Sequence, residues 1–193
     1  MDTLAAIAAR RSIGRLGPPA PTADDLAALL RAGAQAPDHG ELRPFRFVVL
    51  QGPAKDAFGA VLEEAYVLRC RAMDAEPVPA KREKERTKLG RAPLVIVVAA
   101  VEQPSEKIPW EEQVAAASAA CQNILIAATA LGYGSIWRTG DPSYDPHVKR
   151  ALGFDDDAAL VGWLYLGTPL PGSAPPAKEP TADGLVSTWV PQP

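Results

Sequence analysis

The chain has 193 residues, of which 47% are apolar, and a formal net charge of −3. This length and composition suit one folded domain, so we expect residues 1–193 to form a single domain whose segment 170–193 is a proline-rich extended tail. The acidic balance and the scattered basic residues argue against nucleic acid as a partner. The two cysteines have no CxxC spacing, and the two histidines do not have metal-ligand spacing, so we expect no metal site. This use of few cysteines fits a protein of the reducing cytoplasm.

Two apolar stretches could be mistaken for membrane-targeting or membrane-spanning segments, and neither has the features of one. The N-terminal residues place their arginines after the apolar stretch, whereas a secretory signal needs them before it. The longest apolar stretch, 114–131, is alanine-rich and contains Ser118, Gln122 and Asn123. We therefore expect it to be a buried helix of a soluble protein.

The N-terminal third predicts two helices and a strand. Asp2 can cap a first helix over 3–11, and Thr22 with Asp25 forms a weak capping box for a second helix that ends near 33–35. A polar loop over 36–44 then leads into an apolar strand over 45–50.

The rest of the chain continues to interleave helices and strands. We expect helices over 53–72 and 110–131, buried strands over 94–100 and 160–166, and a short extended segment over 135–139. The charged segment 78–91 predicts a solvated helix or mobile loop, or alternatively a lid over a cofactor site. Residues 185–190 can add a strand to a sheet edge, either in their own chain or in a partner subunit. With no regular βαβ repeat and no GxGxxG after a strand, the pattern favours an α+β fold in which helices cover a small sheet.

Three clusters of residues can contact a ligand. Arg10, Arg11, Ser12 and Arg15 suit a phosphate, although cations at a helix end also complement its dipole. His39, in the polar loop, can bond a ligand or transfer protons, or it bonds Asp38 or the backbone instead. The third cluster comprises Trp137, Arg138 and Thr139, which follow several small residues. Small residues let the backbone approach a flat ligand, and the side chains of Arg138 and Thr139 can donate hydrogen bonds to it. The default interpretation of Trp137 is a core residue.

Four ordered elements together are more specific than any one of them. RRS-x-x-R, the APDH loop that runs into RPFRF, GYGSIWRTG and YLGTP follow one another along the chain. In this order they resemble the flavin-dependent nitroreductase family, and in particular its compact branch. The resemblance implies a nitroreductase-like α+β fold, with a small, mainly antiparallel central sheet flanked by helices and a C-terminal tail that reaches over a partner subunit.

The resemblance also implies a site and an activity. It implies a homodimer with FMN at the interface, held by Arg10, Arg11 and Ser12, with Arg15 as a possible phosphate ligand, and by the stretch Trp137, Arg138 and Thr139, while Gln35 and His39 come from the other subunit. NADH or NADPH reduces the flavin, Arg10 or Arg11 stabilises the reduced ring, and a nitroaromatic, quinone or similar acceptor is then reduced in a ping-pong cycle without a catalytic side chain. Residues 121–126 match a stretch of the compact branch that contacts the nicotinamide cofactor, which gives one interpretation. Their apolar pattern favours the other, that they belong to the core. The alternatives are a flavin-sequestering protein with little turnover and other flavin chemistry on the same fold, such as dehydrogenation or dehalogenation.

Overall fold

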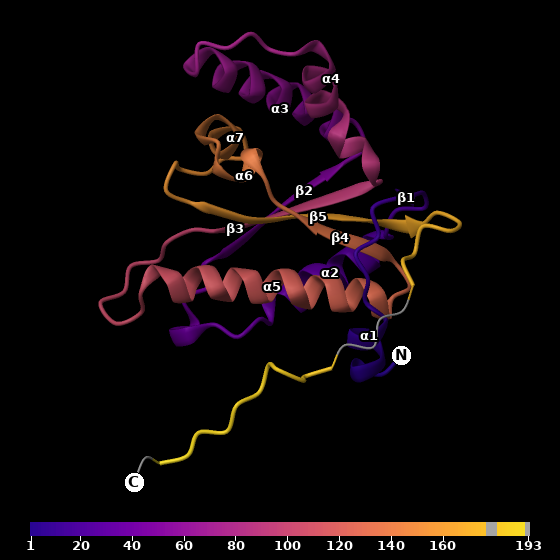
Figure 1. Ribbon diagram of the computed structural model, residues 1–193, viewed down its shortest axis with the longest axis vertical. Helices are drawn as coiled ribbons and strands as arrows, with labels where there is room; N and C mark the ends of the chain where they lie inside the picture. Colours follow the sequence, from indigo (N-terminus) through magenta and orange to yellow (C-terminus); the bar gives the residue numbers. More distant parts are fainter. Residues whose placement is uncertain (177–180, 192–193) are drawn as a thin grey trace.

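The computed structural model describes residues 1–176 and 181–191 and has a five-stranded antiparallel sheet at its centre (Figure 1). β3 (Leu94–Ala100) lies between β2 (Phe45–Gln51) and β5 (Ala159–Pro169), and all seven of its residues are buried. β4 (Gly134–Arg138) and the two-residue β1 (Leu16–Gly17) pair one after the other with the far edge of β5. The expected α+β fold with a mainly antiparallel sheet is confirmed.

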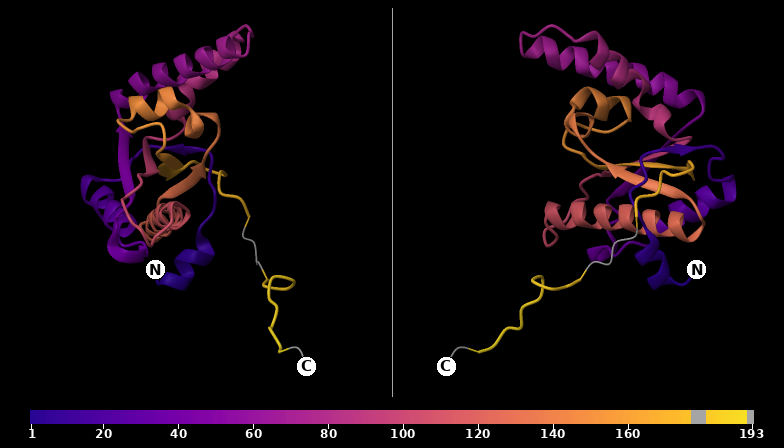
Figure 2. Two further views of the ribbon diagram at one scale, coloured as in Figure 1. Left: turned by 90° about the vertical axis from the view of Figure 1, so that its left-hand side faces the viewer. Right: turned by 45° about the vertical axis from the view of Figure 1, so that its right-hand side comes forward.

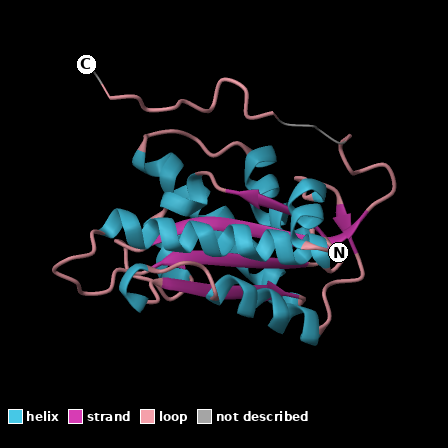
Figure 3. Ribbon diagram, turned by 90° about the horizontal axis from the view of Figure 1, so that it is seen from below, coloured by secondary structure: helices cyan, strands magenta, loops and turns pink. Residues whose placement is uncertain are grey.

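One face of the sheet is covered by α5 (Trp110–Ala130), α2 (Ala23–Ala34) and, beyond them, α1 (Thr3–Ala9), as Figures 1 and 3 show. The apolar side chains of α2, α5 and the inward residues of the strands form one cluster of the core. α5 is long and apolar enough to cross a membrane by length and composition alone, yet its inner side packs on the sheet, as expected for a core helix.

The opposite face is covered by α3 (Pro53–Ala72), by α4 (Pro79–Thr87) lying along α3, and by the short helices α6 (Asp141–Tyr144) and α7 (Pro146–Ala151) (Figure 2). A second apolar cluster fills this side. Two 3-10 turns, η1 (His39–Glu41) and η2 (Lys88–Arg91), complete the described elements. The sheet therefore separates two helical layers.

A glycine lets α4 approach α3 closely. A Cβ added to Gly59 would lie 2.1 Å from the backbone oxygen of Arg86, far inside ordinary contact. Beside this contact, the carboxylate of Glu63 accepts from Arg82 Nε at 2.9 Å and from Arg86 Nη1 at 3.0 Å, and these bonds hold its pKa below the ordinary value. The charged segment 78–91 is thus a helix fixed to α3, which agrees with the prediction of a solvated helix.

Several predicted boundaries need correction. α1 ends at Ala9 rather than 11, because the backbone of Arg10 already has a non-helical ψ of 126°. β5 is longer than the expected 160–166, since it pairs with β3, β4 and β1 in succession. The expected segment 135–139 begins and ends one residue earlier, as β4. In the described tail, 185–190 forms no strand within its own chain.

Candidate functional site

The segment after α1 lies directly beside β4, although more than a hundred residues separate them in sequence. Ser12 forms a parallel bridge with Ser135, and Ile13 N donates to the backbone oxygen of Ser135 at 2.9 Å. Next along the chain, the guanidinium of Arg138 lies 3.6 Å from where a Cβ on Gly14 would stand. The first and third predicted clusters are therefore parts of one surface.

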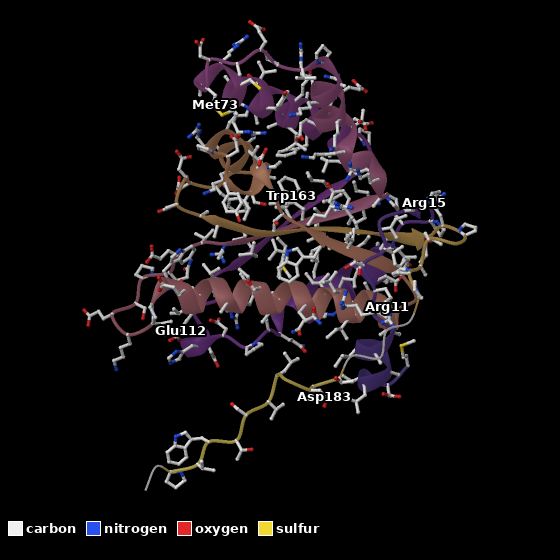
Figure 4. All side chains as sticks on the ribbon, in the orientation of Figure 1. Arg11, Arg15, Met73, Glu112, Trp163 and Asp183 are labelled. Atoms are coloured by element: carbon white, nitrogen blue, oxygen red, sulfur yellow. The ribbon has the colours of Figure 1, made fainter. Side chains whose placement is uncertain are left out.

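Arg10, Arg11 and Ser12 line a cavity of about 770 Å³, together with α1 and with Pro175 and Pro176 of the tail; we call it the outer cavity. Arg11 Nη1 donates to the backbone oxygen of Ala8 at 2.5 Å, so this arginine does cap α1 in the way that the helix-dipole alternative requires. Arg15 is exposed and lines neither this cavity nor the next one. Figure 4 shows Arg15 well away from Arg11.

A second cavity, of about 280 Å³, lies between α4, the end of β4 and the face of β5; we call it the inner cavity. Arg138 and Thr139 line it on one side, and Trp163 and Tyr165 of β5 line it on another. Its remaining charged lining comes mainly from the segment after α3: Lys84, Glu85, Lys88 and Arg91, with Asp141 at the start of α6. Four cations thus face two carboxylates, which makes the cavity suitable for an electron-rich or anionic ligand.

Within the inner cavity, Lys88 Nζ contacts Glu85 Oε2 at 2.5 Å, and both side chains are less than one-fifth exposed. Burial raises the pKa of the Tyr165 phenol to about 12, against the opposing effect of the nearby Arg91 and Arg138 guanidinium groups. At neutral pH this phenol is therefore protonated and can donate a hydrogen bond.

Most of the residues that line the inner cavity are not among those predicted from the sequence. A signal was present, because Lys84, Lys88 and Arg91 are spaced by four and three residues and so fall on one face of a helix. The lid alternative for segment 78–91 pointed to this region, and α4 does form one wall of the cavity. Tyr165 gave a weaker signal, as a polar aromatic in an apolar strand.

The side chain of Trp137 belongs to the core, as its default interpretation predicted. It packs against the cluster on the α5 side, and its Nε1 donates to the backbone oxygen of Val161 at 2.9 Å. Beyond the bridge at Ser135, the outer edge of β4 pairs with no strand in the described part of the chain. A ligand would therefore meet Trp137 through its backbone.

His39 lies at the far end of α5 from these cavities, and Gln35 lies beside the middle of this helix, since the neighbouring Ala36 packs with Ala117 and Ala120. Gln35 follows α2, and His39 Nδ1 is 2.7 Å from Glu112 Oε2, in the first turn of α5, so the histidine bonds this carboxylate rather than Asp38. Ser12 and β4, in contrast, stand at the C-terminal end of α5, and Figure 4 shows Glu112 and Arg11 near its opposite ends. Since α5 is about 30 Å long at 1.5 Å per residue, one chain does not bring the two groups together.

The stretch 121–126 has a buried side and an accessible side, since Gln122 is exposed and Asn123 and Ile126 are half-buried. Cys121 and Ile124 are fully buried, and Leu125 is nearly so. Their side chains cannot reach a nicotinamide cofactor in the folded chain, and burial raises the pKa of the Cys121 thiol to about 12. The core interpretation therefore holds for these three residues, and contact of the rest of the stretch with a nicotinamide cofactor stays a prediction.

The two cavities lie on opposite faces of the sheet, at the outer edge of β4. In the strand register Ser135 pairs with Leu166 of the cluster under α5, and Arg138 pairs with Trp163 of the cluster under α3, so their side chains point to opposite faces. A ligand that contacts both segments would lie along this edge. From Ser135, beside the outer cavity, to Arg138 in the inner one, the chain advances three strand residues, or about 10 Å. The hydroxyl of Ser135 is buried and has no hydrogen-bond partner within the described residues, and bridged residues direct their side chains to the same face, so it lies on the side of Ser12. These donors and cations fit FMN, which has a phosphate at one end and a flat ring with a polar edge at the other.

Solved structures share this architecture and define the class of fold as that of the nitroreductases. A nitroreductase-like family protein from Bacillus cereus has a TM-score of 0.80 at 24% identity, covering 98% of this chain and 96% of that one. A nitroreductase from Bacteroides fragilis, solved with bound FMN, has a TM-score of 0.73 at 24% identity, covering 98% and 100%.

Comparison of sequences identifies the family as well as the fold. The profile of the Nitroreductase family matches residues 7–168. The Escherichia coli K12 protein named "Putative NAD(P)H nitroreductase YdjA" is 40% identical over 169 residues, which are 88% of this chain and 89% of that protein. The chain belongs to the nitroreductase family.

Proposed function

We propose that the protein is an FMN-dependent oxidoreductase that takes electrons from NADH or NADPH and passes them to nitroaromatic, quinone or similar acceptors. The observation that carries this proposal is the junction of Ser12 with Ser135, which sets the arginine-and-serine segment along the same sheet edge as Arg138 and Thr139. Family membership and the FMN bound by the B. fragilis relative support the same cofactor.

The chain's own residues bind, orient and stabilise the cofactor. Arg10, Arg11 and Ser12 bind the phosphate through charge-assisted and hydroxyl hydrogen bonds. The backbone of Trp137 and the side chains of Arg138 and Thr139 contact the ring. When bound, FMN supplies the two-electron chemistry, so no acid or base is assigned to the protein. The cations of the inner cavity, rather than Arg10 or Arg11, stabilise negative charge at the ring edge.

A complete site needs two copies of the chain. Because Arg10–Ser12 and His39 lie at opposite ends of α5, a two-fold axis across this helix brings each group against the other group of the partner, with Gln35 between them. Leu4 and Ile7 of α1 are 77% and 47% exposed beside the outer cavity, which suits a surface covered in a dimer. We therefore place one FMN at each of two equivalent interface sites.

The tail also suits a dimer. Leu185, Val186, Trp189 and Val190 are exposed apolar residues in an extended segment. On the sheet, β2 has one unpaired edge among the described strands. We propose that 185–190 of one chain adds a strand to the β2 edge of its partner. The two buried free thiols fit a cytoplasmic location.

Titration of the purified protein with FMN, followed by flavin fluorescence, tests cofactor binding. Replacing Arg10 with alanine should weaken binding about 10- to 100-fold, the usual effect of losing a hydrogen bond between charged groups. Arg150→Ala, in α7 and outside both cavities, is the matched control and should bind normally. Unchanged FMN affinity in Arg10→Ala contradicts the phosphate site.

Two further assays test turnover and assembly. Stopped-flow mixing with NADH or NADPH should reduce the bound flavin faster than free FMN, and an equal rate favours a sequestering protein. Light scattering should give twice the chain mass of 20.4 kDa. Leu4→Glu should shift this mass toward the monomer, whereas Leu68→Glu, an exposed leucine on the opposite face, should not.

A further inference from the structure

The imidazole of His39 is held by the first turn of α5. Its Nδ1 lies 2.7 Å from Glu112 Oε2, a hydrogen bond between residues that are 73 positions apart in the sequence. The neighbouring carboxylate of Asp38 is engaged elsewhere, because its Oδ2 accepts from the backbone N of Arg43 at 2.5 Å. Since an ionised carboxylate can only accept, Nδ1 is the donor of this bond, and in the neutral ring the proton lies on Nδ1.

The backbone around His39 is fixed without Glu112. Gly40 has a φ of 73°, and a Cβ added there would lie 2.5 Å from Ile108 Cδ1, so the turn packs closely on the segment before α5. Ile108 itself is 9% exposed. These contacts hold the loop in place, so the specific contribution of Glu112 is to the side chain of His39, whose rotamer and tautomer it sets.

The second ring nitrogen of His39 is left free for a contact outside the chain. The side chain is 65% exposed, and Nε2 has no hydrogen-bond partner among residues 1–176 and 181–191. With the proton on Nδ1, Nε2 of the neutral ring carries a lone pair and is an acceptor. The groups of FMN that can donate to it are the hydroxyls of its ribityl chain and the N–H of its ring, whereas its phosphate and carbonyl oxygens only accept.

We propose that Glu112 is a positioning residue, which orients His39 and keeps its proton on Nδ1, so that Nε2 accepts a hydrogen bond from a hydroxyl or N–H group of the flavin held by the arginines of the partner subunit. This inference rests on the proposed dimer with FMN at its interface. Glu112 acts only through the imidazole, because its carboxylate binds the nitrogen that the flavin does not use. The residue therefore prepares the site before the cofactor arrives.

Nitrogen NMR of the imidazole shows where the proton of His39 lies. At alkaline pH, where the ring is neutral, the wild-type chain should have a protonated Nδ1 and an unprotonated Nε2, and Glu112→Ala should have the ordinary mixture of tautomers. The chain has two histidines, so His147→Asn removes the other set of signals and assigns those of His39. An unchanged tautomer in a folded Glu112→Ala protein overturns the inference.

FMN titration measures the consequence for binding. His39→Ala should weaken binding about 3- to 10-fold, the usual effect of losing one hydrogen bond, and Glu112→Ala should account for most of that factor. Because Glu112 acts through His39, adding Glu112→Ala to His39→Ala should cause no further loss, whereas independent effects would multiply. Glu112→Gln keeps an oxygen acceptor for Nδ1 and should restore most of the affinity.

Glu111→Ala is the matched control, because Glu111 is the other acidic residue in the first turn of α5 and its removal takes the same charge from the same helix end. It should change neither the tautomer of His39 nor FMN affinity, and thermal melting checks that all variants fold. Unchanged FMN affinity in a folded Glu112→Ala protein, or a further loss in the double variant, overturns this inference alone, provided that the wild-type chain binds FMN. Failure of the wild-type chain to bind FMN overturns the proposed function as well.

Discussion

Replacing Gly59 with alanine has two opposing effects on stability, one from helix propensity and one from packing. Alanine in the middle of a helix is favoured over glycine by about 0.5–1 kcal/mol, so propensity alone predicts a more stable protein. The new Cβ would meet the backbone oxygen of Arg86 at 2.1 Å, whereas close carbon–oxygen contacts are about 3.3 Å. α4 must therefore move by about 1 Å, and overpacking of this kind costs about 1–3 kcal/mol.

The cost of the packing clash should exceed the gain in helix propensity, because the obstructing atom belongs to the backbone of α4. Glu63 holds this helix in place through hydrogen bonds from Arg82 and Arg86. We expect Gly59→Ala to lower the unfolding free energy by about 1–2 kcal/mol, and Tm by roughly 2–4 °C for each of them in a chain of this size. FMN affinity should fall with it, since α4 carries Lys84 and Glu85 of the inner cavity.

Urea denaturation and FMN titration, both at one protein concentration, measure the two effects. Ala57→Gly, at an exposed position of the same helix, measures propensity without the contact and should leave FMN affinity unchanged. A Gly59→Ala protein that is more stable than the wild type, by the amount that Ala57→Gly loses, would refute the reasoning.

Three other residues give independent tests. Gly162→Ala places a Cβ 2.6 Å from Trp137 Nε1, so stability should fall by about 1–3 kcal/mol in urea denaturation, and an unchanged midpoint would contradict the contact. Tyr133→Phe removes the main cause of the lowered Asp25 pKa, which should rise toward its ordinary value in an NMR titration. Since ionised Asp25 is the form that accepts this bond, the wild type should be more stable than the variant at neutral pH, and the difference should vanish as the pH falls through the folded-state pKa. Burial raises the pKa of Cys121 to about 12, so a thiol reagent should label it only after unfolding, and rapid labelling of the native protein would count against that burial.

The long elements were predictable because each has a periodic apolar pattern of its own. The strand over 94–100 and the helix over 53–72 have the predicted bounds, and the strand that begins at Phe45 is one residue longer than expected. Short elements depend on tertiary contacts instead. β1 pairs with β5, α6 packs on β5, and α7 packs on α3 and α6, so local sequence did not indicate these short elements.

The candidate site was predictable as a set of segments but not as a surface. Arginines and a serine at 10–12 indicated an anion site, and small residues near 134–140 indicated a flat ligand. Their junction depends on the pairing of Ser12 with Ser135, which no local pattern specifies. The residues of α4 and β5 that line the inner cavity are brought there by the sheet topology, so the sequence indicated only that segment 78–91 was charged.

The length of α5 has a genetic consequence. If each site takes its arginines from one chain and His39 from the other, Arg10→Ala and His39→Ala damage opposite halves of the same site. Each variant alone makes dimers in which both sites are impaired. A dimer formed from one chain of each kind concentrates both substitutions in one site and leaves the other intact. Two inactive alleles expressed in one cell should therefore complement each other.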